Sequence, residues 1–482
     1  MNCLLWNIRG IGKGEKVMSI RELIDSHKVS FLGLVETKHK RTLMSRIKRL
    51  WGNEDFELCE VFASKTNGGG LAAIWDTTTL SITNKVYSER WILLEGEIIK
   101  ASFKCCIGVV YGPNDKIGRN MVFSELKNAI TSINKPTLLL GDFNVILNPW
   151  ERVGTLRCDR SIKNFSDWIR DVGLIDIPLQ GLKFTWRRNE SKSKLDRGLC
   201  CNEWLLKYPN LKLMGLRRSC SDHNPLLLCL EDSHNWGPKP FRTYDAWFLN
   251  PNFNDFILNE WENLPSVPLN EKLKILKGPM RTWSKEHFHQ LDYKINNLET
   301  AIHDLERISD DRSLGDIEKA RLLAAQSLLQ SYLIRRERIW RQKARSYGFK
   351  MKDHNTKFFM ASTLIRRKRN EIVSTKVNGR CIQGTSNLKS EIQNFFAQRF
   401  SQESTPDFDF ELENHPKLTA EQATSLETYP SRDEVKNAVW ACGVDKAPGY
   451  DGYNFKFLRV MWETIKEEVY DFVMAFLTLG YR

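Results

Sequence analysis

Residues 138–144 read Leu-Leu-Leu-Gly-Asp-Phe-Asn, so that three consecutive leucines are followed, after a glycine, by a carboxylate and then a carboxamide. Three leucines in a row predict a short strand that is buried on both faces. In α/β folds, functional polar groups occupy the loops that follow such strands. Asp142 and Asn144 are therefore candidate functional residues, and on an extended backbone their side chains would point the same way. A G-D-x-N sequence alone is also a common turn.

Polar side chains end other predicted strands of residues 1–231 in the same way. Strands predicted at Cys3–Ile8 and Val29–Val35 lead to Asn7 and Glu36. The remaining strand-end residues are Tyr111, Asp196, Asp222 and His223. Strands alternate with helices at first and then form hairpins, including a pair at Ile92–Ile99 and Phe103–Val110 and a turn at Gly68–Gly70. This pattern predicts an α/β fold of two packed sheets flanked by helices.

The residue types at these strand ends favour metal-assisted phosphodiester chemistry. The oxygens of Glu36, Asp222 and Asn7 are hard ligands of the kind that Mg²⁺ prefers, with Mn²⁺ as a possible substitute. A divalent cation would neutralise the charge that develops on a phosphate and on its leaving oxygen. His223 could contact the phosphate or relay a proton. For any one of these residues taken alone we favour a cap, a turn or a polar core group, but their recurrence at the strand ends of one domain favours a functional role.

Composition limits the class of protein. A chain of 482 residues is expected to hold two or three domains, and its net charge of +13 suits a polyanionic partner such as nucleic acid. Eleven cysteines without a C-x-x-C spacing favour reduced thiols over disulfides or a zinc site. We find no signal peptide and no apolar run of membrane-spanning length. We therefore expect a soluble intracellular protein that does not contact membranes.

Beyond a Pro-rich boundary at 235–242, the sequence predicts long helices. Apolar residues recur in steps of three and four from Phe288 to Leu305, as in a coiled-coil seam, and helical patterning resumes from Ile317 to Trp340. An antiparallel helical hairpin fits this pattern. It would serve as an arm between domains, as a dimer seam or in intramolecular packing, and we favour the last; the oligomeric state stays open.

A basic stretch with interleaved aromatics follows the hairpin. Basic charge mixed with aromatic rings suits nucleic acid through phosphate contacts and base stacking, although a solvated charged face is the usual alternative. Residues 366–369 would also serve as a nuclear localisation patch. The candidate nucleic-acid-binding residues here are Arg341, Lys343, Arg345, Arg366, Arg367, Lys368 and Arg369.

Six short motifs of residues 1–231 occur in an order and spacing that resemble the endonuclease/exonuclease/phosphatase superfamily. They are W-N-I-R-G at 6–10, V-E-T-K at 35–38, Y-G-P at 111–113, G-D-F-N at 141–144, L-D-R at 195–197 and S-D-H at 221–223. Within the superfamily they resemble the apurinic-endonuclease-like domain of LINE-type (non-LTR) retrotransposon proteins.

The resemblance implies a four-layered α/β sandwich of two mixed sheets and a Mg²⁺-dependent DNA nick. It implies Glu36 as the principal metal ligand with Asn7 and Asp222 nearby, and Asp142 as the activator of water. Asn144 and Tyr111 would contact the phosphate, Asp196 would orient His223, and Thr185 would lie near the DNA. Which carboxylate is the base and how many metal ions bind stay open.

Within the segment Asp445–Gly452, residues 446–452 read K-A-P-G-Y-D-G. This resembles the K-A-P-G-P-D-G motif that opens the reverse transcriptase of the same elements, with Tyr450 in place of the second Pro. We expect a basic helical linker at 232–375 and a truncated, α-rich start of a reverse transcriptase at 376–482. The one Asp-Asp pair, Asp310-Asp311, lies between predicted helices rather than after an aromatic strand. We therefore expect no polymerase activity from this polypeptide.

The leading hypothesis is a nuclear endonuclease of a LINE-type element that nicks target DNA to prime reverse transcription, with element RNA as a further partner of the basic linker. One alternative is an inactive nucleic-acid-binding remnant of such an element. Another is a host phosphoesterase of the same superfamily. The strand-end residues favour the first hypothesis.

Overall fold

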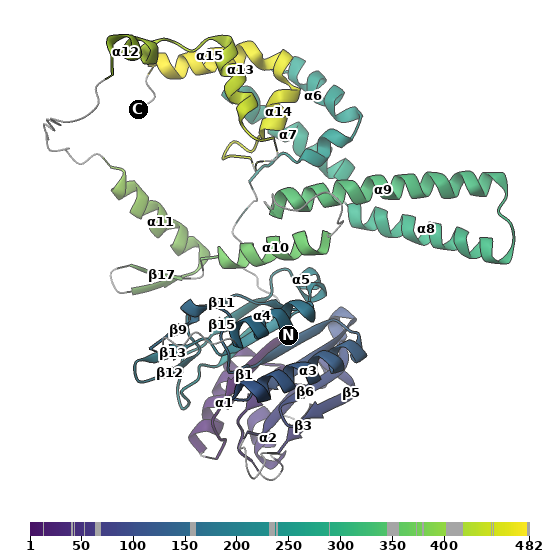
Figure 1. Cartoon of the computed structure of the whole chain (residues 1–482), viewed down its shortest axis with the longest axis vertical. Coiled ribbons are helices and arrows are strands. Elements are labelled where there is room, and N and C mark those ends of the chain that lie inside the picture. The colour runs from purple at the N-terminus through teal and green to yellow at the C-terminus, as the bar shows by residue number, and fades with distance from the viewer. Residues whose placement is uncertain are drawn as a thin grey trace, which may run out of the picture. The chain divides into compact units, whose positions relative to one another are not determined.

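The computed structural model describes the chain in two compact units. The first unit comprises Met1–Trp236 and Leu364–Arg399, and the second comprises Gly237–Thr363 and Phe400–Arg482. Figure 1 shows that the first unit contains the sheets and the second is helical. The described residues are 1–12, 14–39, 42, 44–52, 54–62, 69–154, 161–230, 237, 240–288, 290–344, 356–372, 374–377, 380–401, 418–444, 446 and 448–479.

Two mixed sheets form the centre of the first unit. The seven-stranded sheet has the order β11-β15-β16-β1-β2-β4-β3, with β11 (Leu179–Gln180), β15 (Lys212–Gly215), β16 (Leu226–Cys229), β1 (Asn2–Asn7), β2 (Phe31–Val35), β4 (Leu71–Asp76) and β3 (Phe56–Val61). The six-stranded sheet has the order β10-β14-β8-β7-β6-β5, with β10 (Ile175–Asp176), β14 (Asp196–Cys200), β8 (Thr137–Asp142), β7 (Phe103–Tyr111), β6 (Trp91–Ile98) and β5 (Leu80–Ser88).

The inner faces of these sheets pack closely against each other. A Cβ added at Gly33 of β2 would lie 3.0 Å from a Val109 methyl carbon of β7 and 3.4 Å from a Leu5 methyl carbon of β1. The strands therefore need apolar side chains on both faces, which explains why β1, β2 and β8 are buried almost throughout.

Helices cover the outer face of each sheet. Ile20 and Ile24 of α1 (Gly14–His27) and Leu50 of α2 (Met44–Trp51) pack on β1 and β2, whereas Phe123 of α3 (Lys116–Ile133) and Phe165 of α4 (Ser161–Asp171) pack on β8 and its neighbours. The order helix, sheet, sheet, helix is the predicted four-layered α/β sandwich, so this prediction is confirmed.

The predicted hairpins are present. β6 and β7 pair antiparallel, as expected for residues 92–110. The glycine run also connects an antiparallel pair, because Val61 of β3 lies opposite Leu71 of β4. Gly69 and Gly70 have φ values of +90° and +88°, whereas Gly68 is outside the described residues.

Shorter elements complete the first unit. A three-stranded sheet combines β12 (Trp186–Arg188), β13 (Ser191–Ser193) and β9 (Arg152–Val153). The remaining elements are η1 (Ile99–Ala101), η2 (Pro149–Glu151), α5 (Asn202–Lys207), the hairpin β17 (Ser374–Val377) with β18 (Arg380–Gln383), and α11 (Thr385–Arg399).

The compact units divide the chain differently from the expected boundaries at 232 and 376. Residues 364–399 belong to the first unit because the end of α10 (Thr356–Arg369) and the residues after it bond to β11 and β15. Lys212 pairs with Glu371 at 2.7 Å, and Gln180 donates to the same carboxylate at 3.3 Å.

The second unit has one aromatic-rich core, drawn from sequence that we expected to form two different domains. Phe253 and Trp283 from the expected linker pack with Phe457 and Trp462 from the expected polymerase segment. The contributing elements are η3 (Asp245–Leu249), α6 (Asn252–Glu262), α7 (Leu269–Phe288), α13 (Arg432–Ala441), α14 (Phe455–Val460) and α15 (Trp462–Leu479); α12 (Ala420–Glu427) precedes α13.

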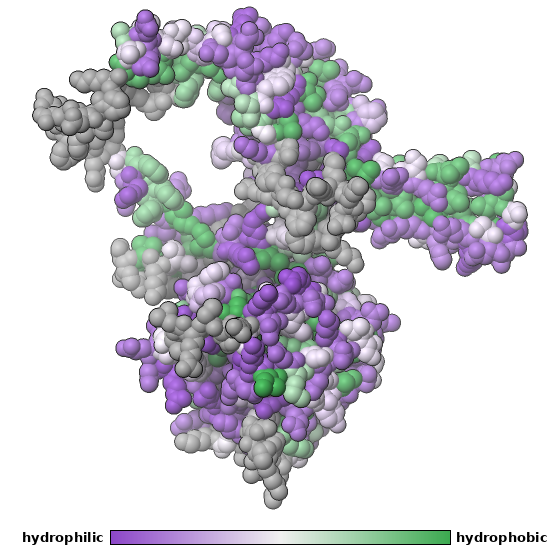
Figure 2. Space-filling view, in the orientation of Figure 1, coloured by the Kyte–Doolittle hydropathy of each residue, from purple (hydrophilic) through white to green (hydrophobic). Residues whose placement is uncertain are grey.

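The predicted helical hairpin is also confirmed. It consists of α8 (Leu291–Asp311) and α9 (Asp316–Ala344), which pack on each other. Figure 2 shows apolar side chains along the middle of the hairpin, between two hydrophilic margins. Its seam residues Leu291, Ile295 and Ile302 are buried within one chain, in agreement with intramolecular packing. A dimer seam stays a prediction.

The end of the K-A-P-G-Y-D-G segment has a packing role in the second unit. Gly452 has a φ of +87°, and a Cβ added there would lie 2.3 Å from the backbone oxygen of Phe241. The Gly452 oxygen accepts a hydrogen bond from the Thr243 N–H at 2.8 Å. Asn454 donates to Asp245 at 2.7 Å, which fixes this loop against the start of the unit.

We predict that Gly452→Ala lowers the free energy of unfolding of the second unit by about 1–3 kcal/mol, because alanine is strained at positive φ and its Cβ would meet Phe241. Faster amide hydrogen exchange at Thr243 is the measurement. Gly449→Ala is the matched control, because its Cβ would make only an ordinary contact at 3.5 Å. Equal exchange rates in the two variants would contradict the prediction.

Candidate active site

The predicted strand-end residues gather at one edge of the two facing sheets. β1 and β2 run parallel, as do β7 and β8, so that each pair ends at the same edge. Asn7, Tyr111 and Asp142 are the last residues of β1, β7 and β8, and Glu36 directly follows β2. All four side chains are buried or nearly so, and burial strengthens the electrostatic interactions between them.

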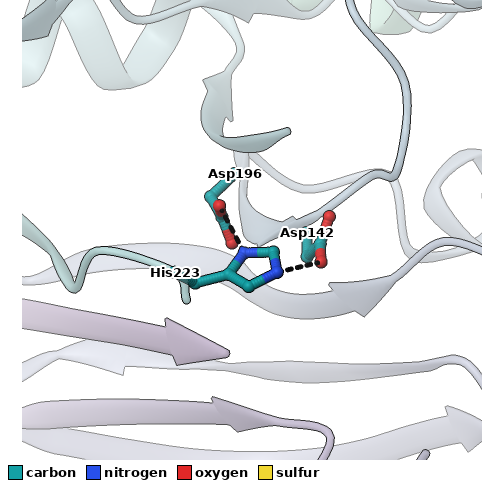
Figure 3. Close-up of side chains that lie close together, drawn as sticks. All are labelled: Asp142, Asp196 and His223. Atoms are coloured by element: carbon teal, nitrogen blue, oxygen red, sulfur yellow. Dashed lines mark hydrogen bonds and ion pairs between the residues drawn. The ribbon is translucent and has the colours of Figure 1, made fainter. Parts of the chain in front are cut away.

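Asp142 and Asp196 are direct neighbours because β14 pairs antiparallel with β8 in the register Asp196↔Asp142. His223 lies between the two carboxylates, as Figure 3 shows. Its Nδ1 is 2.9 Å from Oδ2 of Asp196, and its Nε2 is 3.8 Å from Oδ2 of Asp142. The structure therefore brings together three residues that are far apart in the sequence.

Burial and mutual charge shift the protonation of this group. Burial, followed by the charge of Asp196, raises the pKa of Asp142 to about 7. Burial alone would lower the pKa of His223, but the charges of Asp196 and Asp142 outweigh it and raise that pKa to about 9. At neutral pH the imidazole of His223 therefore carries a proton. The pKa of Asp142, at about 7, lies near the operating pH, as is best for a general base.

Asn7 links Asp142 to Glu36. Its side-chain nitrogen donates to Oε1 of Glu36 and to Oδ2 of Asp142, both at 2.9 Å. Tyr111 lies near Glu36, and its pKa is raised by burial and then by the charges of Glu36 and Asp142. Two carboxylates thus converge on one amide beside a phenol that keeps its proton.

Asp222 is held by two residues that we had not named individually. Arg9 Nε lies 2.9 Å from Oδ1 of Asp222, and Trp186 Nε1 donates to its Oδ2 at 3.0 Å. Arg9 also lies 3.9 Å from Glu36, and Lys38 Nζ lies 3.6 Å from the same carboxylate. Arg9 belongs to the W-N-I-R-G motif and Lys38 to the V-E-T-K motif. Each lies two residues after a candidate site residue, Asn7 or Glu36, and this proximity was the signal in the sequence that could have identified them.

The backbone is unusual at several residues of this site. Arg9, Glu36, Lys38 and Asn144 have φ values of +47°, +53°, +55° and +51°, in the left-handed region that such residues seldom adopt. The strand β2 therefore ends in a turn that directs Glu36 inward, and Lys38 N–H fixes the turn by donating to the Gly69 oxygen at 2.9 Å. Such strain is commonly retained where function requires it.

Asn144 does not continue the strand with Asp142, contrary to the extended geometry that we expected. The strand ends at Asp142, and the Asn144 N–H donates back to Oδ1 of Asp142 at 3.0 Å in an Asx-type turn. The Asn144 side-chain nitrogen donates to the Gly112 oxygen at 2.7 Å. The turn thus joins the ends of β7 and β8.

Thr185 has a different role from the one expected of a residue near DNA. Its side chain is fully buried, and its hydroxyl oxygen accepts hydrogen bonds from the N–H groups of Leu195 and Asp196, both at 3.0 Å. Thr185 therefore fixes the backbone that carries Asp196 and is not exposed to a ligand.

The basic residues of the linker separate in the structure. Lys368 is buried and donates to the Leu211 oxygen, so its expected contact with nucleic acid is corrected to a structural one. Arg367 and Arg369 are exposed, whereas Arg366 and Arg341 are half-buried. Lys343 lies 4.4 Å from the Trp340 ring centroid, and Arg345 is outside the described residues.

The donor set fits a hard divalent cation in two places. Asp142, Asp196 and His223 offer ligand atoms that all lie within 4.8 Å of one another. However, Nδ1 of His223 already bonds to Asp196. The second place is around Asn7, whose side-chain nitrogen donates to the carboxylates of both Glu36 and Asp142. Asp222 is connected to this group because Arg9 lies beside both Asp222 and Glu36. Carboxylate oxygens, which are hard ligands, therefore surround Asn7. A cation there requires Asn7 to present its oxygen, which now accepts from Arg9 N–H at 3.2 Å.

The first unit combines two facing mixed sheets with a buried acid–histidine group at the strand ends. Residues 4–223 match the model of the Endonuclease/Exonuclease/phosphatase family, so this part of the chain is similar to that family. The residues matched include every candidate catalytic and metal-binding residue named above.

The chain is also similar to a transposon-encoded protein. It is 23% identical over 389 residues to the Transposon TX1 uncharacterized 149 kDa protein of Xenopus laevis, an alignment that covers 74% of this chain and 29% of that relative. The chain therefore spans less than a third of the length of the relative.

Among solved structures, the chain is similar to the endonuclease domain of TRAS1, a telomere-specific non-LTR retrotransposon, at 14% identity and a TM-score of 0.38 over 48% of this chain and 99% of that one. The AP endonuclease LMAP from Leishmania major gives 15% identity and a TM-score of 0.38, with 47% and 86% covered. Among the described residues, no helix has the length and apolarity that a membrane span requires.

We predict that Thr185→Val lowers the free energy of unfolding by about 1–3 kcal/mol, because two buried N–H groups lose their acceptor. Urea unfolding of the full chain is the measurement, and Thr185→Ser, which keeps the hydroxyl, is the control. If Thr185→Val left the stability unchanged but weakened DNA binding, the result would contradict this structural role and support the expectation that Thr185 lies near the DNA.

The raised pKa values of Asp142 and His223 predict how stability depends on pH. Both groups bind a proton more tightly when folded, so stability falls as pH rises from about 4 to 7 through Asp142 and from about 6.5 to 9 through His223. In EDTA, the double variant Asp142→Asn with His223→Gln should lose less stability than the wild type between pH 5 and pH 9 in urea unfolding. Equal losses would contradict the assigned shifts.

Proposed function

We propose that the first unit is a metal-dependent DNA endonuclease of a LINE-type (non-LTR) retrotransposon protein, and that its nick provides the primer for reverse transcription. The observation that carries the proposal is the buried Asp142–His223–Asp196 group beside Glu36 and Asn7. The relation to a transposon-encoded protein supports the biological setting.

In the proposed reaction, the oxygen of a water molecule bonds to phosphorus and the bond from phosphorus to the 3′ oxygen breaks. The products are a 3′-hydroxyl, which receives a proton, and a 5′-phosphate. Asp142 accepts the proton of the attacking water, for which its raised pKa is suited. His223, held as an imidazolium by Asp196, donates a hydrogen bond to a phosphate oxygen. Tyr111 contributes a second donor beside Glu36.

We infer that Glu36, Asn7 and Asp222 hold the cation, with Mg²⁺ as the favoured ion and Mn²⁺ as a substitute. A bound cation would supply Lewis-acid stabilisation of charge on the phosphate and leaving oxygens. Arg9 and Lys38 place positive charge beside Glu36, and this charge would attract the phosphate to the proposed cation site. Asn144 has one remaining amide hydrogen for a phosphate oxygen.

DNA as the substrate is supported by exposed positive charge close to the site. Arg188 ends β12, whose first residue Trp186 forms a β-bridge with His223. Arg217 and Arg218 are exposed as well, and Arg218 donates to the Arg187 oxygen at 3.0 Å. Such guanidinium groups suit phosphates along a strand.

We further propose element RNA as a partner of Arg341, Lys343 and the exposed Arg367 and Arg369, and a nuclear location directed by residues 366–369. Because Lys368 is buried, the exposed basic residues of the stretch 366–369 are Arg367 and Arg369, and Arg366 is half-buried. A shift of a fusion protein from nucleus to cytoplasm on Arg367→Ala with Arg369→Ala would test the location.

We predict that the full chain nicks supercoiled plasmid with Mg²⁺ and not with EDTA, and that Asp142→Asn and His223→Ala each lower the rate at least about 100-fold. The conversion of supercoiled to open-circular DNA is the measurement. Asp167→Asn is the control, because this half-exposed carboxylate pairs with Arg170 on the surface of α4, away from the strand ends. Hydrolysis of a phosphoinositide without nicking of plasmid or apurinic duplex would overturn the DNA proposal in favour of a host-type phosphoesterase.

A further inference from the structure

Four charged side chains are buried together on the face of the six-stranded sheet opposite to His223. The exposed fractions of the side chains are 0% for Arg197, 10% for Glu151, 10% for Lys194 and 19% for Asp176. None of these residues was a candidate from the sequence, and Arg197, the central one, is inaccessible to solvent. Two cations and two anions balance the group to zero net charge.

Arg197 is the centre of this group. Its guanidinium bonds to Glu151 through both terminal nitrogens, to Asp176 at 3.0 Å and to the Lys194 oxygen at 3.3 Å. It also lies 5.9 Å from the ring centroid of Phe165 in α4. Only the planar fork of an arginine can reach two carboxylates and a carbonyl from one position.

Glu151 extends the group to the chain that follows the G-D-F-N turn. Its Oε2 accepts hydrogen bonds from the N–H groups of Leu147 at 2.7 Å and Asn148 at 3.3 Å. Its backbone oxygen accepts from Lys194 N–H at 2.9 Å. One carboxylate therefore ties the loop after Asn144 to the chain that enters β14.

The group acts on the strand residue that orients His223. Arg197 is adjacent to Asp196 in β14, and alternation along the strand puts Arg197 on the outer face opposite Gly141 and Asp196 on the inner face opposite Asp142. The N–H of Phe143 donates to the Leu195 oxygen at 3.1 Å, which fixes the same segment from the side of β8. A displacement of Arg197 would therefore move the Asp196 carboxylate by way of one peptide unit.

We propose that Arg197 and Glu151 are positioning residues that hold Asp196 in register with His223 and so set the turnover of the site. The proposal rests on the proposed endonuclease function for its kinetic consequence. Retaining four buried charges is costly unless each is paired, and the loss of one partner leaves another uncompensated. Apolar side chains at the same four positions would pack, but their contacts are non-directional and would not fix the orientation of β14 at Asp196.

The kinetic test compares Arg197→Lys, Arg197→Met and Glu151→Gln in the full chain with the wild type. We expect kcat for plasmid nicking to fall about 10- to 100-fold in Glu151→Gln and Arg197→Met, with a smaller loss in Arg197→Lys, while KM for DNA stays within about threefold. Rates are compared below the onset of unfolding of each variant, followed by circular dichroism.

Glu371→Gln is the matched control. Glu371 pairs with Lys212 at 2.7 Å, and the side chains are 17% and 8% exposed, so that a comparably buried ion pair is lost. Lys212 lies beside Cys229 and hence beside the start of β1, at the opposite end of the sheet from Asn7. This control should lower stability and leave kcat unchanged.

A second readout does not depend on nicking. In proteins labelled with ¹⁵N-histidine, the His223 signal, assigned by its loss in His223→Gln, reports the Nδ1 proton that Asp196 accepts. We expect this proton to exchange faster with water in Glu151→Gln and Arg197→Lys and to be unchanged in Glu371→Gln. Unchanged exchange and unchanged kcat in folded variants would overturn the proposal. Altered exchange with no nicking by the wild type would uphold the positioning role and reject the endonuclease function.

Discussion

The antiparallel pairing of β8 with β14 is the interaction on which the rest of the site depends. It places Asp142 opposite Asp196 on the inner face of a sheet, where two carboxylates would repel each other in a medium of low polarity. His223 makes the arrangement possible because its imidazolium lies between them. The raised pKa of His223 is the result of that position. The buried charge is thus held in a form suited to proton transfer.

The surroundings of this pair are organised to keep it in place. Asn7 joins Asp142 to Glu36 from the facing sheet, and Thr185 holds the backbone of Asp196. Arg197 bonds the same strand to Glu151 on the outer face. The close packing of the two sheets around Gly33 brings Asn7 and Glu36 within reach of β8. The site is therefore a property of the whole sandwich and not of any one loop.

Much of this arrangement was predictable because strand ends combine two readable signals. A run such as Leu138–Leu140 identifies a buried strand, and a polar residue directly after it identifies the functional edge of the sheet. The turn at Asn144 and the burial of Thr185 could not be predicted in this way, because both depend on hydrogen bonds to Gly112 and to Leu195 and Asp196. Local sequence does not reveal such partners. The same holds for Lys368, whose basic neighbours suggested an exposed patch.

The measurement that tests the central claim most directly is the location of a bound cation. We predict that anomalous scattering from crystals of the full chain grown with Mn²⁺ shows a peak next to Glu36, within coordination distance of its carboxylate, and that Glu36→Gln removes it. A peak enclosed by Asp142, Asp196 and His223 instead, or the absence of any peak at the strand ends, would contradict the proposed roles of Glu36 as metal ligand and of His223 as a protonated partner of two aspartates.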